Sequence, residues 1–284
     1  MAITGSIGII GAGTMGNGIA QVCAAAGLRV TMLDVQDAAL GRGMDTIRRN
    51  LERLVAKDKM SAEARDAALA RITPTLDYAG LRESALVVEA ATENLDLKLR
   101  VLRQVASAVG DDAVIATNTS SISITQLAAV FDRPERFIGM HFFNPVPVMA
   151  LLELIRGIQT SDATHAAAVE FARAIGKSPI TVRNSPGFVV NRILCPMINE
   201  AIFVLQEGLA SAEDIDSGMR LGCNHPIGPL ALADMIGLDV MLSVMEVLQE
   251  GFGDPKYRPA PLLREMVAAG RLGRKSGKGF FSYR

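Results

Sequence analysis

Two side chains in neighbouring apolar runs are the strongest candidates for acid–base chemistry in this chain. His141 ends the run at residues 137–141, just before a turn with two prolines, and Glu153 lies inside the run at residues 150–155. Histidine ionises close to neutral pH, so a positioned imidazole can take up and return a proton. A lone carboxylate among aliphatic residues is costly to bury, which predicts that Glu153 pairs with His141. The alternative is a core histidine held by a structural partner.

A glycine-rich loop near the start of the chain predicts a dinucleotide site. It lies between an apolar strand at residues 6–10 and a helical pattern, and it consists of Gly11, Ala12, Gly13, Thr14, Met15 and Gly16. The three glycines suit a tight turn, a close approach of the backbone to a pyrophosphate, and close packing of helix on strand. A glycine turn without a ligand is the alternative.

An acidic residue ends the next predicted strand, residues 29–33. This residue, Asp34, would accept hydrogen bonds from the adenosine ribose of a dinucleotide. Val35 and Gln36 follow it, so no arginine is in place for a 2′-phosphate. The sequence therefore favours NAD over NADP.

Polar residues follow two more predicted strands. The strand at residues 85–90 leads to a turn that contains Glu93, and the strand at residues 113–117 leads to Ser120. Open α/β sheets bind their ligands at the carboxyl ends of the strands, so Ser120 is a candidate contact. A serine that caps the following helix is the ordinary alternative.

Strand and helix patterns alternate until Asn184, which predicts an α/β fold with a doubly wound sheet. We therefore expect two domains, residues 1–184 and residues 185–284. Only helical spacing follows the boundary, with Pro196 predicted to kink the first helix and Asn191 placed opposite its apolar stripe. Asn191 would face either the cleft between the domains or solvent. The predicted helices cover residues 189–205, 212–221, 230–248 and 260–268.

Two basic segments need an explanation. A long helical region at residues 44–66 has an apolar stripe on one side and a group of cations on the other, namely Arg48, Arg49, Arg53, Lys57 and Lys59. Such a face is usually solvated, and the alternative is an anion site for a phosphorylated ligand. The tail at residues 272–280 is basic and rich in glycine, and it is either a flexible end or a loop at the edge of a cofactor.

Composition excludes several classes of function. The 284 residues have a formal net charge of -1 and contain no tryptophan, which argues against a nucleic-acid partner. Three scattered cysteines show no zinc spacing, so we expect no metal site and a reducing compartment. Glycines interrupt the uncharged N-terminal run, so it is a poor signal peptide and a poor membrane span. A cytoplasmic protein is the expectation.

Taken together, the motifs resemble the L-3-hydroxyacyl-CoA dehydrogenase family, in particular its short-chain, single-function bacterial members. The resemblance covers nearly the whole chain, and the stretches at residues 141–145 and 186–192 are the most specific. It implies a Rossmann-type N-terminal domain that binds NAD, and an all-α C-terminal domain that forms a homodimer and contributes to the substrate site. The segments that carry it are residues 11–16, 89–94, 118–121, 141–147, 184–192 and 273–277.

The resemblance also assigns roles. His141 would be the catalytic base, Glu153 its orienting partner, and Ser120 and Asn191 the contacts of the substrate oxygen. The implied NAD contacts are Gly11 to Gly16, Asp34, Glu93, Lys98, Asn144 and Lys275. The implied coenzyme A contacts are Ser120, Asn50, Arg53 and Lys57. Arg49 and Arg53 are arginines where relatives can have lysine, and the two side chains bind phosphate with different geometry.

The function implied is NAD-dependent oxidation of (S)-3-hydroxybutyryl-CoA or another short 3-hydroxyacyl-CoA, and the reverse reduction of acetoacetyl-CoA, as used in fatty acid and butanoate metabolism. Two alternatives stay open at this point. One is a dehydrogenase of a free 3-hydroxy acid, which would have no use for the basic helix. The other is a non-catalytic NAD-binding module, which would have no reason to keep His141 and Glu153 together.

Overall fold

The computed structural model describes residue 3 and residues 5–283. Contacts between Cα atoms divide the chain into two compact units, residues 1–184 and residues 185–284. Each unit has its own buried apolar core, and we describe each by itself.

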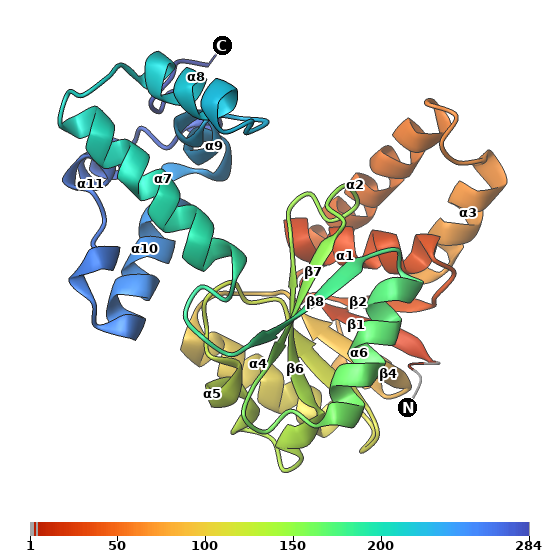
Figure 1. Ribbon diagram of the computed structural model, residues 1–284. Coiled ribbons are helices and arrows are strands. Elements are labelled where there is room, and N and C mark those ends of the chain that lie inside the picture. The colour runs from red at the N-terminus through yellow and green to blue at the C-terminus, as the bar shows by residue number, and fades with distance from the viewer. Residues whose placement is uncertain (1–2, 4, 284) are drawn as a thin grey trace. The chain divides into compact units, whose positions relative to one another are not determined.

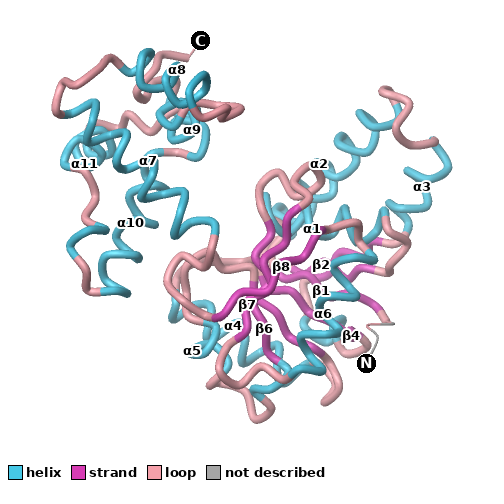
Figure 2. The backbone as a smooth tube through the Cα atoms, viewed as in Figure 1, coloured by secondary structure: helices cyan, strands magenta, loops and turns pink. Residues whose placement is uncertain are grey.

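The first unit is built on one eight-stranded sheet with the strand order β3-β2-β1-β4-β5-β6-β7-β8. Neighbouring strands are parallel except for β6 and β7, which pair in antiparallel fashion. Figure 2 shows the strands as one twisted layer. They are β1 (Ser6–Ile10), β2 (Val30–Leu33), β3 (Ile72–Thr75), β4 (Ser84–Glu89), β5 (Val114–Thr117), β6 (Phe137–Phe142), β7 (Leu151–Arg156) and β8 (Ser178–Arg183).

Helices cover both faces of this sheet (Figure 1). Those on one face share a buried cluster with the strands: α1 (Thr14–Ala25), α2 (Asp37–Val55), α3 (Ala62–Ala70) and α6 (Asp162–Ala174). The other face is covered by α4 (Leu95–Ala108) and α5 (Ile124–Ala128). Short 3₁₀ turns lie at η1 (Tyr78–Leu81) and η2 (Pro134–Arg136). The prediction of a doubly wound α/β sheet is confirmed.

The central strands are apolar runs because both of their faces are buried. Along β1, Ile7, Ile9 and Ile10 are at most 2 % exposed, and β4 continues the core with Leu86, Val87 and Val88. The helix after β1 and the helix after β4 belong to opposite faces. The strand order therefore reverses between β1 and β4, which is where such sheets bind their ligands.

The basic region differs from the prediction of one helix over residues 44–66. The structure has a helical hairpin, because α2 already begins at Asp37 and ends at Val55. Asp58 then has φ of 53°, a left-handed conformation that no helix continues through. Ser61 caps α3 by accepting a hydrogen bond from the backbone N–H of Ala64. The short strand β3 was not predicted, because Pro74 lies inside it and is tolerated only at a sheet edge.

The second unit is helical, as predicted. Its core is formed by apolar residues of α7, α9, α10 and α11, such as Ile198, Leu230 and Met245. The expected helix at residues 230–248 is broken at Gly237, whose φ of 104° suits only glycine. The helices are α7 (Val190–Gln206), α8 (Ala212–Gly222), α9 (Pro229–Ile236), α10 (Leu238–Phe252) and α11 (Pro261–Ala268), with 3₁₀ turns η3 (Pro255–Tyr257) and η4 (Arg274–Ser276).

Ile193 has the helical spacing of the apolar residues of α7, yet it is 67 % exposed. The C-terminal tail packs on α9, because the buried carboxylate of Asp234 accepts the backbone N–H groups of Phe280 and Phe281 at 3.0 and 2.9 Å.

Across residue 3 and residues 5–283, no helix has the length and apolarity needed to cross a membrane.

Candidate active site

The glycine-rich loop lies at the carboxyl end of β1 and has the shape that a dinucleotide requires. Gly11 turns with φ of 95°, and a Cβ atom on Gly16 would lie 1.7 Å from the carbonyl oxygen of Gly11. A Cβ atom on Gly13 would meet nothing within 4 Å, and no side chain caps the N-terminus of α1 at this residue. The first turn of α1 thus offers its N–H groups to an open space, which fits a pyrophosphate.

Asp34 ties this loop to the end of β2. One carboxylate oxygen accepts the backbone N–H of Ala12 at 2.9 Å, and the other accepts the N–H of Gln36 at 3.0 Å. A carboxylate offers about four acceptor positions, so positions remain for ribose hydroxyls. The predicted acid therefore also shapes the loop.

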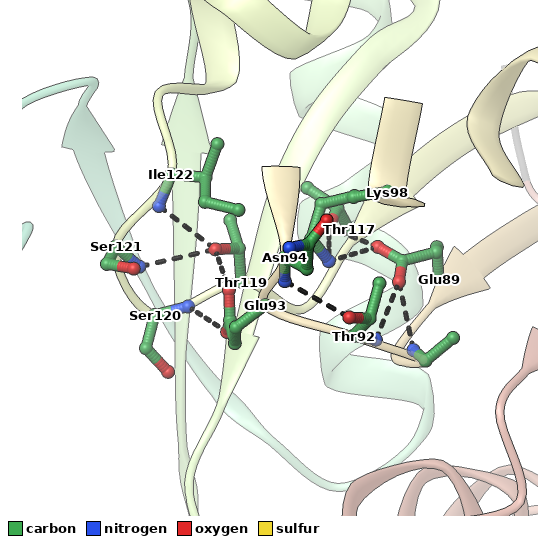
Figure 3. Close-up of polar contacts among 11 residues, drawn as sticks. Glu89, Thr92, Glu93, Asn94, Lys98, Thr117, Thr119, Ser120, Ser121 and Ile122 are labelled. Atoms are coloured by element: carbon green, nitrogen blue, oxygen red, sulfur yellow. Dashed lines mark hydrogen bonds and ion pairs between the residues drawn. The ribbon is translucent and has the colours of Figure 1, made fainter. Parts of the chain in front are cut away.

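The turn after β4 meets the turn after β5 through Glu93 (Figure 3). One oxygen of Glu93 accepts the hydroxyl of Thr119 at 2.7 Å, and the other accepts the backbone N–H of Ser120 at 2.9 Å. Both predicted residues thus lie in one polar cluster at the carboxyl edge of the sheet.

His141 lies between Ser120 and Glu153. Nδ1 of the imidazole is 2.7 Å from the Glu153 carboxylate, and Nε2 is 3.2 Å from the Ser120 hydroxyl. His141 is 5 % exposed and Glu153 is fully buried. A carboxylate only accepts hydrogen bonds, so Nδ1 must donate, which leaves Nε2 of a neutral imidazole as the acceptor. The basic nitrogen therefore points to Ser120.

The turn between β6 and β7 carries Asn144, an exposed predicted cofactor contact. Lys177, a residue that sequence reasoning did not single out, donates hydrogen bonds to this turn. Its Nζ donates to the carbonyl oxygens of Val146 at 2.5 Å and Met149 at 2.7 Å. A Cβ atom on Gly18 of α1 would lie 2.9 Å from that of Val146, so α1 packs closely on the same turn.

Lys98 is placed differently from a simple cofactor contact. It is 1 % exposed, and its ammonium group donates to Glu89 at 2.5 Å and to Thr117 at 3.2 Å. An ammonium group has three N–H donors, so two are already used within the protein. Glu89, which holds Lys98, is a second residue that the sequence analysis missed.

The predicted coenzyme A contacts lie on α2 and just beyond it. Arg53 and Lys57 are exposed, and Asn50 donates to the side chain of Gln21 at 3.1 Å. Within the described part of the chain, Arg53 and Lys57 form no ion pair, in contrast to Arg48, which pairs with Asp45 at 2.7 Å. These two side chains are available to an anion.

Two predicted residues belong to the second unit. Asn191 is the second residue of α7, and Lys275 lies in η4, where it pairs with Asp239 at 2.6 Å. Residue 3 and residues 5–283 contain no group of three His, Cys, Asp or Glu side chains arranged to hold a metal ion.

A strand–glycine–helix turn, an acid at the next strand end and a buried histidine–carboxylate pair define a dehydrogenase that uses a nicotinamide dinucleotide. Two family descriptions match this chain. Residues 6–185 match "3-hydroxyacyl-CoA dehydrogenase, NAD binding domain", and residues 187–283 match "3-hydroxyacyl-CoA dehydrogenase, C-terminal domain". The chain belongs to the 3-hydroxyacyl-CoA dehydrogenase family, and its cofactor is NAD.

Individual proteins are similar to this chain over nearly its full length. A 3-hydroxybutyryl-CoA dehydrogenase of Bradyrhizobium diazoefficiens is 52 % identical over 283 residues, covering 100 % of this chain and 97 % of its own. The crystal structure of (S)-3-hydroxybutyryl-CoA dehydrogenase from Ralstonia eutropha is 64 % identical, with a TM-score of 0.96 over 98 % of this chain and 99 % of its own. A structure described as a diketoreductase has 30 % identity and a TM-score of 0.85, covering 100 % of both chains. The chain is thus also similar to an enzyme named for another substrate class.

Proposed function

We propose that this enzyme interconverts (S)-3-hydroxybutyryl-CoA and acetoacetyl-CoA, and that His141 is its acid–base group. The observation that carries the proposal is the position of the imidazole, with Nδ1 on the buried Glu153 carboxylate and Nε2 on the Ser120 hydroxyl. An acid–base group must reach the reacting oxygen with a defined tautomer. The contact with Glu153 supports a defined tautomer, and the contact of Nε2 with Ser120 supports its placement at the substrate.

When bound at the glycine loop, NAD would supply the acceptor for the hydride that leaves C3 of the hydroxyacyl group. In that direction, Nε2 of His141 removes the proton of the substrate hydroxyl. Glu153 stabilises the imidazolium that forms and keeps the ring in one orientation, as the aspartate does in a serine-protease triad. In the reverse direction, the imidazolium returns the proton to the developing alkoxide, and Ser120 donates a hydrogen bond to the same oxygen.

The residues of the first unit also fit the cofactor. The open space over Gly13 and the N-terminus of α1 would hold the pyrophosphate, and Asp34 would hold the adenosine ribose. Glu93, Lys98 and Asn144 would serve the nicotinamide side, since Glu93 and Asn144 lie in the turns that follow β4 and β6 and Lys98 lies in the first turn of α4. Lys275 is proposed as a contact from the second unit.

The coenzyme A part of the substrate is proposed to lie along α2, with Arg53, Lys57 and Asn50 near its phosphates and Ser120 near its acyl end. Exposed cations without a partner in the described chain suit phosphate groups. Asn191 is proposed as a second contact of the reacting oxygen.

We also propose that the second unit forms a homodimer. It exposes several large apolar side chains, including Leu209, Leu221 and Met235. Exposed apolar area is a common mark of a protein interface. Light scattering coupled to size-exclusion chromatography would show twice the chain mass, and a monomer mass would contradict the proposal.

The function is tested by following NADH oxidation with acetoacetyl-CoA and with free acetoacetate, each repeated with NADPH. Turnover with the thioester and NADH is expected, with little turnover in the other three combinations. Comparable turnover with free acetoacetate would instead support a dehydrogenase of free 3-hydroxy acids, a possibility that the diketoreductase similarity makes worth testing.

A further inference from the structure

One buried carboxylate beneath the site has no role in the chemistry described above. Glu89 is the last residue of β4 and is fully buried. One of its oxygens accepts the backbone N–H groups of Ala91 at 2.9 Å and Thr92 at 3.4 Å. The other accepts the ammonium of Lys98 at 2.5 Å and the hydroxyl of Thr117 at 2.7 Å (Figure 3). Four donors from three chain segments therefore converge on one side chain.

Stability alone is a weak reason for this arrangement. Removing two charges from water is costly, and replacing a buried ion pair by apolar residues is often neutral or stabilising. Residues 85–88 of β4 are apolar, and Glu89 is the one charged residue of this strand. What the ion pair does specifically is fix the conformation of the chain segment between Glu89 and Lys98.

That segment is the turn at residues 90–94. Glu89 holds its start through two backbone N–H groups, and it holds α4 on the far side through Lys98. Asn94 closes the turn, because its side chain caps α4 at the N–H of Leu97 at 2.9 Å and its own N–H donates to Thr92 at 3.1 Å. The turn is thus fixed at both ends.

A continuous chain of contacts leads from this turn to the acid–base group. Glu93 lies within the turn and accepts the N–H of Ser120 at 2.9 Å. The hydroxyl of Ser120 is 3.2 Å from Nε2 of His141. A displacement of the turn would therefore move Ser120 relative to the imidazole.

We propose that Glu89 is a positioning residue, which sets the place of Ser120 against His141 by holding the turn that carries Glu93. The inference rests on the proposed function of Ser120 and His141. Glu89 touches neither substrate nor the reacting atoms, and it acts through the turn.

The decisive variant is Glu89→Gln, which keeps the shape of the side chain. An amide cannot accept from the turn on one side and from Lys98 and Thr117 on the other, because one side then faces an NH₂ donor. We expect kcat with acetoacetyl-CoA at saturating NADH to fall by at least about tenfold, within the range for residues coupled in one network. The matched control is Glu83→Gln, an exposed glutamate just before the same strand, which should retain wild-type kcat.

A double-mutant cycle tests the route of the effect. If Glu89 acts through Ser120, Glu89→Gln should cost less than about twofold in a Ser120→Ala background. An equal loss in both backgrounds, or wild-type kcat in Glu89→Gln alone, would overturn the proposal.

A readout independent of turnover separates this proposal from the proposed function. The chain has three histidines, so the His141 ring signal can be assigned in an NMR spectrum by comparison with His141→Gln. Glu89→Gln should shift that signal and Glu83→Gln should not; an unshifted signal would overturn the proposal even if the wild-type enzyme proved inactive with acetoacetyl-CoA. If Glu89→Gln does not fold, the His141 ring signal is measured in Glu89→Met with Lys98→Met, which leaves no unpaired charge, and kcat is left out of that comparison because Lys98 is also a proposed NAD contact. Failure of both to fold would make the pair a stability element and overturn the proposal.

Discussion

His141 and Glu153 are directly opposite each other in the register of the antiparallel β6–β7 pair, and their side chains meet at 2.7 Å. Opposed residues on neighbouring strands project on the same face of a sheet, so the backbone pairing itself brings the imidazole and the carboxylate together. The orientation of the imidazole that we propose as the acid–base group is therefore set by regular secondary structure and not by a mobile loop.

The first prediction concerns this pair. His141→Gln removes the proton acceptor, and we expect turnover of acetoacetyl-CoA to fall by about 10²–10⁴-fold, the usual contribution of a general base. NADH binding, measured by fluorescence, should be retained, since the glycine loop and Asp34 lie elsewhere at the sheet edge. His165→Gln is the control, because His165 is a histidine outside the candidate site: it lies on α6 and forms a hydrogen bond with Thr181 at 2.8 Å. Loss of NADH binding in His141→Gln would mean that its role is misassigned.

The basic end of α2 gives a second prediction. Arg53→Ala and Lys57→Ala should each raise KM for acetoacetyl-CoA with little change in kcat, because they remove a phosphate contact far from the reacting carbonyl. The effect should shrink as salt is added, since exposed charges are screened within about 10 Å at an ionic strength of 0.1 M. Arg65→Ala is the control, because that arginine pairs with Asp66 at 2.8 Å. Unchanged KM in both variants would show that the basic face of α2 is an ordinary solvated surface and not a coenzyme A site.

The third prediction is that Lys177 stabilises the turn that carries Asn144. Lys177→Met leaves the carbonyl groups of Val146 and Met149 without their donor, and an unsatisfied buried polar group costs about 1–3 kcal/mol. We expect a lower thermal midpoint and a higher KM for NADH. Lys59→Met, at an exposed lysine, should change neither quantity. Wild-type values in Lys177→Met would show that the turn holds its shape without this side chain.

The three cysteines should differ sharply in reactivity. Burial raises the pKa of Cys23 and of Cys195 from 9.0 to about 12, whereas Cys223 is exposed. The thiolate is the reactive form, so a thiol reagent used near pH 9.0, the ordinary thiol pKa, should label one cysteine in the folded chain and three in denaturant. Rapid labelling of three cysteines in native buffer would contradict the buried positions.

The same shifts have a consequence for stability. The folded state keeps the protons of these two thiols to a higher pH than the unfolded chain does. Their contribution to the free energy of unfolding is therefore complete below pH 9.0 and is lost as pH rises toward about 12. Cys23→Ala should make the unfolding free energy less dependent on pH in that window. An unchanged pH dependence would count against the shift at Cys23.

Much of the site could be predicted because its residues follow strong local patterns. The glycine loop is recognisable from its position between a strand and a helix, and Glu153 is conspicuous because an isolated carboxylate in an apolar run needs a partner. Local signals also explain the errors. Asp58 and Gly237 break the expected helices through backbone conformation, which hydrophobic spacing does not report.

Glu89 and Lys177 show where sequence reasoning ended. Each is a single charged residue beside an apolar stretch, and each takes partners from distant parts of the chain, such as Thr117 for Glu89 and Val146 for Lys177. A charge of this kind is recognised as structural only when its surroundings are known, because the same residue would be solvated on an exposed strand end.

The sequence by itself determined the class of fold, the position of the glycine loop and the pairing of His141 with Glu153, because periodicity, glycine placement and the cost of burying charge act over short stretches of chain. Only the tertiary structure decided that β6 and β7 run antiparallel, that Nε2 of His141 faces Ser120, and that Glu89 accepts hydrogen bonds from both the turn after β4 and Lys98 of α4. These relationships arise when strands far apart in sequence become neighbours in one sheet, and burial then leaves each polar group only the partners that the packing brings within reach.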